Sequence, residues 1–403
     1  MTNKPLPPNY FFCPPLKLDE KEQLKQQGIA AAFEVAEKTQ LHGGPIEWVL
    51  ESDEQDMKIY KGRDPNSVDG ASGSTLYFSS IEVPGSMDEV VDLFRSQTTE
   101  QAKEYVRRFG HLMTDQITLY SIVPATEDPQ EMIGVCWRAF KPAVEKLAMR
   151  RDACLLDVRH AFTFKGKRVW VRCNKSIELA CCPDLESELG FVRMTHHITG
   201  HIFSESDRPG YLHIDYIAHT DVKGSVGDHA KWIVDISLKK RCRNIQEINR
   251  YLRENRLSKT PFLNNSELVP TRAASKCYLC SRYFGMLSKK INCLKCGQVV
   301  CRRCIQLWNV KNRGFDAQAQ VCNKCSLGNP DDFKLGVHCL SSEKSTSMRS
   351  DGGSSSGYDA YQPHNRQRVD PAAWQKVPES LNNYDLKVTS TGWKSARGAR
   401  CLV

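Results

Sequence analysis

Eight cysteines in the carboxyl-terminal third of the chain are the residues whose spacing most clearly indicates chemistry. They form four CxxC pairs, separated by gaps of 12, 4 and 17 residues: Cys277/Cys280, Cys293/Cys296, Cys301/Cys304 and Cys322/Cys325. A CxxC turn places two thiolates around one tetrahedral Zn(II), and two such pairs leave no open coordination position. The four pairs therefore predict two structural zinc ions and no catalytic metal site.

The order of the pairs favours a cross-braced arrangement, because the gap of four residues makes sequential pairing awkward. We expect one zinc to be bound by Cys277, Cys280, Cys301 and Cys304, and the other by Cys293, Cys296, Cys322 and Cys325. A segment this short buries little apolar surface, so metal binding is expected to supply most of its folding free energy.

The same segment carries the excess positive charge of the protein. Between Lys276 and Ser326 there are ten Lys and Arg residues against one acidic residue, Asp316, which equals the formal net charge of +9 for the whole chain. Eight thiolates and two Zn(II) ions would reduce the charge of the segment to roughly +5. An anionic partner is therefore predicted, and the charge alone does not choose between an acidic membrane surface and nucleic acid. Of the functions considered for the whole chain, nucleic-acid binding is the weakest.

The cysteine spacing, with Gly297 directly after the fourth cysteine, resembles the FYVE zinc finger, a family that binds phosphatidylinositol 3-phosphate on endosomal membranes. The family's basic signature is a run of Arg or Lys, two His, Cys and Arg, and residues 289–297 read KKINCLKCG at the matching place. The two leading cations are kept as Lys289 and Lys290. The two His positions hold Ile291 and Asn292, and the following Arg position holds Leu294.

The resemblance implies a membrane-contact surface on the finger. Its head-group contacts would be Lys289, Lys290, Lys295, Arg302 and Arg303, and its membrane-inserting loop would contain Met286 and Leu287. The family's WxxD motif is absent before the first cysteine, and Gln320 stands where an Arg is usual. Since selective recognition of a phosphoinositide needs several converging donors, we expect weakened or altered specificity and a retained attraction to anionic membranes.

Two other functions fit the same cysteines. The missing donors favour a protein-interaction module, in which the finger binds a protein such as a small GTPase. A RING-like ubiquitin ligase shares the cross-brace, but RING domains usually have a His among the ligands, and none lies between Lys276 and Ser326.

The hydrophobic periodicity of the larger amino-terminal region predicts a mixed α+β domain. Helices are expected at 19–41, from Ser86, at 99–109 and at 228–255, and strands at 46–50, 57–61, 76–83, 117–123, 132–139, 154–164, 168–179, 191–203 and 211–220. On the last helix, the apolar residues at helical spacing are Trp232, Ile236, Cys242, Ile245, Ile248 and Leu252.

This order of elements, together with the phrase RPGY at 208–211, resembles the helix-grip fold of the START lipid-binding family. The resemblance implies an antiparallel sheet curled around the final helix, with an apolar tunnel for one lipid. A filled core that acts as a protein-binding scaffold is the alternative. The function expected is therefore a peripheral membrane adaptor or lipid carrier.

These observations divide the chain into five parts. They are an extended Pro-rich start (1–17), the START-like domain (18–258), a linker (259–275), the FYVE-type finger (276–326) and a low-complexity tail (327–403) that we expect to be disordered. No apolar run is long enough to cross a bilayer, and the start lacks the apolar core of a secretory signal. We expect a cytoplasmic protein, peripheral on endosomal or other anionic membranes.

Enzymatic chemistry is not predicted. The sequence has no Walker A, HExxH or kinase signature, so no catalytic residue is assigned. The run HHITGH is interpreted as ordinary strand residues, with His197 and His201 on one face and His196 on the other.

Overall fold

The computed structural model describes residues 5–328, with gaps at 55, 66–73, 96–98, 111–112, 126–127, 129, 142–148 and 224–230. The tail predicted to be disordered lies outside the described residues from position 329 onward. The described helices are α1 (Leu18–Lys38), α2 (Met87–Leu93), α3 (Thr99–Phe109), α4 (Glu186–Leu189), α5 (Lys231–Ser258) and α6 (Asn323–Leu327).

The strands of the amino-terminal region belong to one sheet. They are β1 (Glu47–Glu54), β2 (Met57–Arg63), β3 (Ser74–Pro84), β4 (Met113–Val123), β5 (Met132–Phe140), β6 (Arg150–Phe164), β7 (Lys167–Ser176), β8 (Phe191–Arg193), β9 (Thr195–Glu205) and β10 (Tyr211–Asp221). Their order is β1-β2-β3-β10-β9-β7-β6-β5-β4, with neighbours antiparallel, and β8 pairs in parallel with β6.

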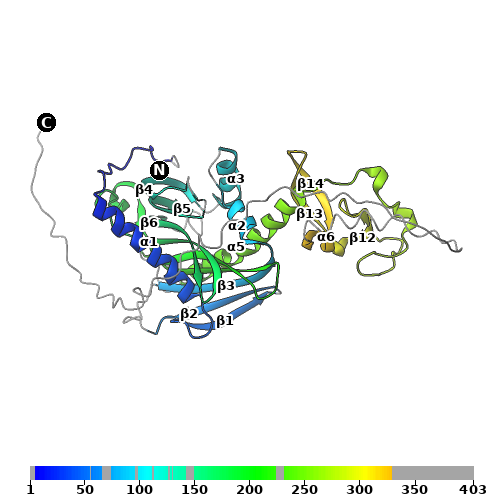
Figure 1. Ribbon diagram of the computed structural model, residues 1–403, viewed down its shortest axis with the longest axis horizontal. Coiled ribbons are helices and arrows are strands. Elements are labelled where there is room, and N and C mark those ends of the chain that lie inside the picture. Colours follow the sequence, from blue (N-terminus) through cyan, green and yellow to red (C-terminus); the bar gives the residue numbers. More distant parts are fainter. Residues whose placement is uncertain are drawn as a thin grey trace, which may run out of the picture.

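The two faces of this sheet bury separate apolar clusters, because successive side chains of a strand point to opposite faces. One face packs against α1, where the cluster includes Trp137 and Val158. The other packs against α2 and α5, where the cluster includes Trp170, Phe203 and Ile245. Figure 1 shows α1 crossing the outside of the sheet while α5 leaves it toward the small domain. The curved sheet closed by a long final helix confirms the predicted α+β helix-grip class.

One prediction for this region is wrong in detail. Residues 191–203 form two strands, because the backbone N–H of Met194 donates to the carbonyl oxygen of Asp152 and directs β8 to the edge of β6. On α5, Trp232 and Ile236 are more than half exposed, so only the later part of the apolar pattern, from Leu238 onward, is buried against the sheet.

The small domain contains β11 (Lys290–Asn292), β12 (Val299–Cys301), β13 (Ile305–Asn312) and β14 (Phe315–Cys322), paired as two short hairpins. Two 3₁₀ turns, Asn265–Glu267 and Thr271–Ala273, lie between α5 and this domain. Its core also includes Leu257 of α5, so the long helix belongs to both domains. In the described part of the chain, no helix is both long and apolar enough to span a membrane.

Candidate metal centres and membrane-facing surface of the finger

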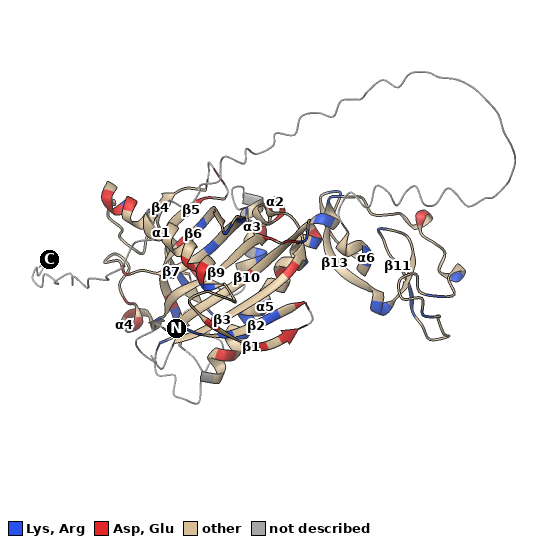
Figure 2. Cartoon of the chain, turned by 60° about the horizontal axis from the view of Figure 1, so that its bottom comes forward, with Lys and Arg blue, Asp and Glu red and all other residues tan. Residues whose placement is uncertain are grey.

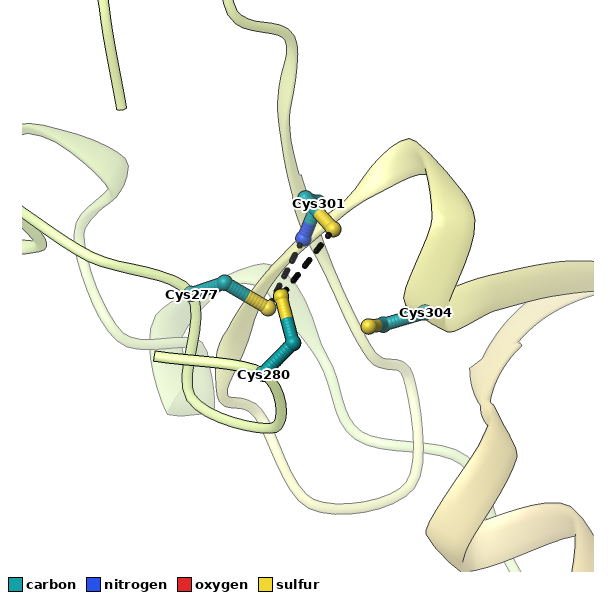
Figure 3. Close-up of side chains that lie close together, drawn as sticks. All are labelled: Cys277, Cys280, Cys301 and Cys304. Carbon is teal, nitrogen blue, oxygen red and sulfur yellow. Dashed lines mark hydrogen bonds between the residues drawn. The ribbon is translucent and has the colours of Figure 1, made fainter. Parts of the chain in front are cut away.

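The eight cysteines of the CxxC pairs gather into two groups of four. In each group the sulfur atoms lie within 4.8 Å of one another, and the members are Cys277, Cys280, Cys301 and Cys304 in one and Cys293, Cys296, Cys322 and Cys325 in the other. Figure 3 shows the first group, with two sulfurs contributed by the loop before β11 and two by the end of β12 and the turn that follows it. The first and third pairs thus meet, as do the second and fourth, which is a cross-brace.

The geometry of both groups fits Zn(II). Four thiolates at about 2.3 Å from a tetrahedral zinc ion would lie about 3.8 Å apart. The Sγ atoms of Cys280 and Cys301 are 3.7 Å apart, and those of Cys296 and Cys322 are 4.0 Å apart. Four thiolates complete the shell, so the two ions would hold the fold together and offer no position to a substrate.

Backbone N–H groups prepare the buried sulfurs for a metal. The amides of Cys301 and Cys322 donate to the Sγ atoms of Cys277 and Cys293, each at 3.3 Å. Burial alone would raise the pKa of the Cys277 thiol, but hydrogen bonds from the backbone of Cys280 and Cys301 lower it to about 6. Because the thiolate is the metal ligand, this arrangement favours binding near neutral pH.

The turn after Cys296 requires glycine. Gly297 has a φ of +73°, a left-handed conformation that side chains rarely adopt, and its N–H donates to the carbonyl oxygen of Cys293. A Cβ at this position would lie 3.1 Å from the carbonyl oxygen of Glu267. The glycine noted in the sequence therefore lets the CxxC turn pack closely on the segment before the finger.

A basic strip lies beside the first metal centre. Lys290 of β11 pairs with Cys301 of β12, which places Lys289 and Lys290 next to the turn that carries Arg302 and Arg303. Among the described residues none of these four cations forms an ion pair, and all except Lys290 are exposed. Figure 2 shows the excess of Lys and Arg over Asp and Glu on the finger.

The loop before this strip presents two apolar side chains to solvent. Met286 and Leu287 have relative exposures of 105% and 102%, so neither packs against the finger. Tyr283, on the same loop, is 74% exposed. Fully exposed apolar side chains next to unpaired lysines form a surface suited to the boundary between lipid head groups and acyl chains.

Lys295 is half-buried and, unlike the other predicted head-group contacts, its ammonium is hydrogen-bonded within the protein. Its ammonium donates to the carbonyl oxygen and the hydroxyl of Thr260 at 2.6 and 2.7 Å, and it lies 3.8 Å from the centroid of the Phe262 ring. Its cation ties the finger to the segment after α5. We therefore leave Lys295 out of the contact surface proposed below.

The substituted family positions also face inward. Ile291 is buried in the core of the finger. The side-chain amide of Asn292 donates to the carbonyl oxygens of Val269 and Gly297 at 2.8 and 2.9 Å. These two positions stabilise the fold of the finger and offer no donor to a bound head group.

Sequence reasoning missed a set of charged residues, buried or half-buried, on the α5-facing side of the large sheet. Asp157 and Arg159 of β6, and Arg172 of β7, interrupt strands that are otherwise apolar. The spacing of Asp157 and Arg159 could have revealed them, because residues two apart lie on the same face of a strand.

Comparison with known proteins identifies the small domain. Residues 267–328 match the family described as FYVE zinc finger, a family whose finger holds two zinc ions. Two curated relatives are similar over this part. Lateral signaling target protein 2 of Caenorhabditis briggsae is 27% identical over 83 residues (20% of this chain), and its homolog in Brugia malayi is 31% identical over 68 residues (17% of this chain). The matched parts span 13% and 11% of the length of these relatives.

Solved structures similar to the large domain are StAR-related lipid transfer proteins. Human StAR-related lipid transfer protein 5 has 17% identity and a TM-score of 0.42, covering 58% of this chain and 97% of that one. The human StarD13 lipid transfer and protein localization domain has 16% identity and a TM-score of 0.36, covering 56% and 94%. At these low scores, the helix-grip assignment rests on the chain's own strand order. Residues 267–328 of this chain match the FYVE zinc finger family, and this finger is attached to the final helix of an α+β helix-grip domain.

Proposed function

We propose that this protein is a peripheral membrane adaptor whose FYVE finger docks on anionic, phosphoinositide-containing membranes such as those of endosomes. The observation that carries the proposal is the position of two fully exposed apolar side chains, Met286 and Leu287, beside the unpaired cations Lys289 and Lys290. A lysine near an anionic leaflet contributes about 1 kcal/mol, and burial of a Met or Leu side chain adds about 1.5–3 kcal/mol. The electrostatic attraction and the apolar burial both act at one edge of the finger.

The inward-facing Ile291 and Asn292 support binding with little selectivity for the 3-phosphate. A phosphoinositide would be attracted by its charge to Lys289, Lys290 and the arginines of the basic strip. We expect phosphatidylinositol 3-phosphate to bind more tightly than phosphatidylserine because it carries more charge, but not much more tightly than its isomers.

The size of the interior space favours an adaptor over a carrier of a whole phospholipid. The described residues between α5 and the sheet line a pocket of about 190 Å³ that is partly open to solvent, whereas pockets for drug-sized ligands span roughly 300–1,000 Å³. A two-chain lipid needs at least that much. We therefore assign membrane contact to the finger and give the large domain a different role.

Vesicle co-sedimentation tests this function. The zinc-loaded full chain should sediment with phosphatidylcholine vesicles that contain phosphatidylserine or a phosphoinositide, and not with phosphatidylcholine alone. Replacing Lys289 and Lys290 by Ala should weaken binding about tenfold or more, from the loss of roughly 2 kcal/mol. The matched control is Lys311→Ala with Arg313→Ala, which removes two charges from the β13–β14 hairpin. Equal binding by both double variants would refute the proposed surface.

A protein partner such as a small GTPase is the second candidate, and the absence of the His and Arg donors favours it. If no anionic vesicle retains the wild-type chain, the exposed loop and the basic strip would belong to a protein interface instead.

A further inference from the structure

A cavity that is partly open to solvent lies between α3, α5 and the middle of the large sheet. Its volume is about 190 Å³. An apolar cavity of about 150 Å³ in another protein holds one benzene molecule, so this space has room for roughly eight non-hydrogen atoms. It is lined by residues of six strands or strand ends, of α3 and of α5, and lies in the domain that the finger's proposed membrane contact does not use.

One wall of the cavity is a row of polar side chains that crosses neighbouring strands. The register pairs Asp157 with Asn174, Arg172 with His201, and His201 with Tyr216. Directly paired residues of adjacent antiparallel strands share one face of the sheet. The row is therefore a built feature of the sheet, and the apolar cluster under α5 is interrupted where it passes.

Some polar groups of this row form hydrogen bonds and an ion pair with neighbouring side chains. The Arg138 guanidinium forms an ion pair with Asp157 and donates to the side-chain oxygen of Asn174 at 2.9 Å. The amide of Asn174 donates to the other Asp157 oxygen at 2.6 Å. The Arg138–Asp157 pair is thus neutral as a unit and braces the floor of the cavity.

Other polar atoms that line the cavity have no partner among the described residues. Both ring nitrogens of His196 lack a hydrogen bond although the residue is only 3% exposed, and the hydroxyl of Thr199 also lacks one. The Nε of Arg172 is unpaired, while its Nη2 donates to the Tyr105 hydroxyl at 3.1 Å. Buried donors and acceptors are nearly always paired in folded proteins, so these atoms indicate a polar occupant.

The unpaired charge on the lining is positive. Arg108 pairs with Glu104, and Arg138 pairs with Asp157. Arg172 and Arg241 form no ion pair within the described part of the chain, and the remaining acidic residue of the lining is Glu247. Arg159 is a further buried cation. It lies directly opposite Arg172 in the β6–β7 register, and its burial, together with the charge of Arg172, lowers its pKa to about 10.

We propose that this cavity binds a small organic anion, whose carboxylate or phosphate group contacts Arg172 while its other polar atoms meet His196 and Thr199. A guanidinium suits such an anion because its planar fork of donors matches two oxygens. Phe94 and Phe140 also line the cavity, and the Arg172 guanidinium lies 4.1 Å from the centroid of the Phe94 ring. The site is independent of the finger's proposed membrane contact.

Titration calorimetry on the zinc-loaded full chain tests the site with benzoate, glycerol 3-phosphate and inorganic phosphate as probes. At least one probe should bind, and Arg172→Met should weaken it about tenfold or more, as expected for loss of a charged hydrogen bond. Arg168→Met is the matched control, since it removes a half-exposed arginine from the same strand and should leave affinity unchanged. Thr199→Val provides a milder variant if Arg172→Met misfolds, and it should also weaken binding.

A lipid head group carries the same anionic groups, so a second experiment distinguishes a small soluble anion from the head group of a bound lipid. The Lys289→Ala, Lys290→Ala variant is incubated with phosphatidylserine vesicles and reisolated, and its bound lipid is measured by mass spectrometry. Lipid that copurifies only when Arg172 is intact, with no binding of the three small probes, would overturn the proposal in favour of a head-group site. Absence of binding in both arms, or small-probe binding that Arg172→Met and Thr199→Val leave unchanged, would also overturn it.

Discussion

The backbone N–H of Asn309 in the finger donates a hydrogen bond of 3.0 Å to Oε1 of Glu254, a side chain of α5 that is only 2% exposed. The same carboxylate accepts from the Nε of Arg250, and the Nη2 of Arg250 donates to the carbonyl oxygen of Leu307. Because Leu257 also enters the finger's core, the finger is fixed on the helix that closes the large domain. The proposed membrane contact of the finger would therefore set the orientation of the large domain.

Replacing Glu254 by Ala should uncouple the two domains. The change removes the buried acceptor of the Asn309 amide, at a cost of about 1–3 kcal/mol. The Arg250 guanidinium also loses its partner, but it is 43% exposed and water can solvate it, so its loss costs less. We expect faster proteolysis between residues 259 and 275 and separation of one thermal transition into two. Glu254→Gln keeps an acceptor oxygen and should behave close to wild type. If Glu254→Ala still unfolds in a single transition at the wild-type temperature, the contact does not couple the domains.

Removal of zinc should unfold the finger. Elemental analysis is expected to return two zinc ions per chain, since the two groups of thiolates are closed. A chelator should expose Trp308, which is 4% exposed in the folded finger, and shift its fluorescence to longer wavelength. Cys293→Ser should remove one zinc ion, whereas Cys13→Ser, outside both groups, should leave two. Two zinc ions retained by Cys293→Ser would contradict the assigned ligands.

The apolar part of membrane binding can be separated from the electrostatic part by salt. High salt screens the attraction between lysines and an anionic surface, but it leaves the burial of Met286 and Leu287 unaffected. Wild-type protein should keep residual vesicle binding at high salt, and Met286→Ala with Leu287→Ala should lose it. Leu307→Ala, an exposed leucine on β13, is the control. Identical residual binding by both variants would show that the loop does not insert.

The cysteines were sufficient to predict the cross-brace, because the spacing of ligand pairs along the chain restricts how two tetrahedral sites can share them. The order of helices and strands was likewise visible from periodicity. Periodicity did not reveal to which face of the sheet each histidine of β9 points. A bulge in the pairing of β9 with β10 skips His197, so His196 lines the cavity together with His201, and His197 stacks on His219 instead. The prediction for His196 and His197 is wrong because one extra residue reverses the alternation, and only the partner strand determines where it falls.

Lys295 illustrates the same limit for the finger. Within the basic signature, nothing in the sequence separates it from Lys289 and Lys290. Its ammonium is withdrawn from solvent because the segment after α5 folds back over it, which brings the oxygens of Thr260 within hydrogen-bonding distance. That contact joins residues 35 positions apart and depends on where the finger docks.

The stability of the large domain should depend on pH through Asp215. Burial raises the pKa of this carboxyl to about 7, against a smaller lowering by a hydrogen bond with Ser80. In the unfolded chain an aspartate titrates near a pH of about 4. Between these values the folded state binds more protons than the unfolded state, so the free energy of unfolding falls as pH rises from about 4 to about 7, by up to about 4 kcal/mol.

Asp215→Asn stays neutral at every pH and should remove this slope. Urea unfolding of the variant should therefore show a free energy that exceeds that of the wild type above pH 7 and converges with it near pH 4. Asp53→Asn, at an exposed position of β1, should retain the wild-type slope. A slope that survives in Asp215→Asn would mean that the carboxyl is already ionised in the folded protein, which would require a cation or solvent near its buried oxygen.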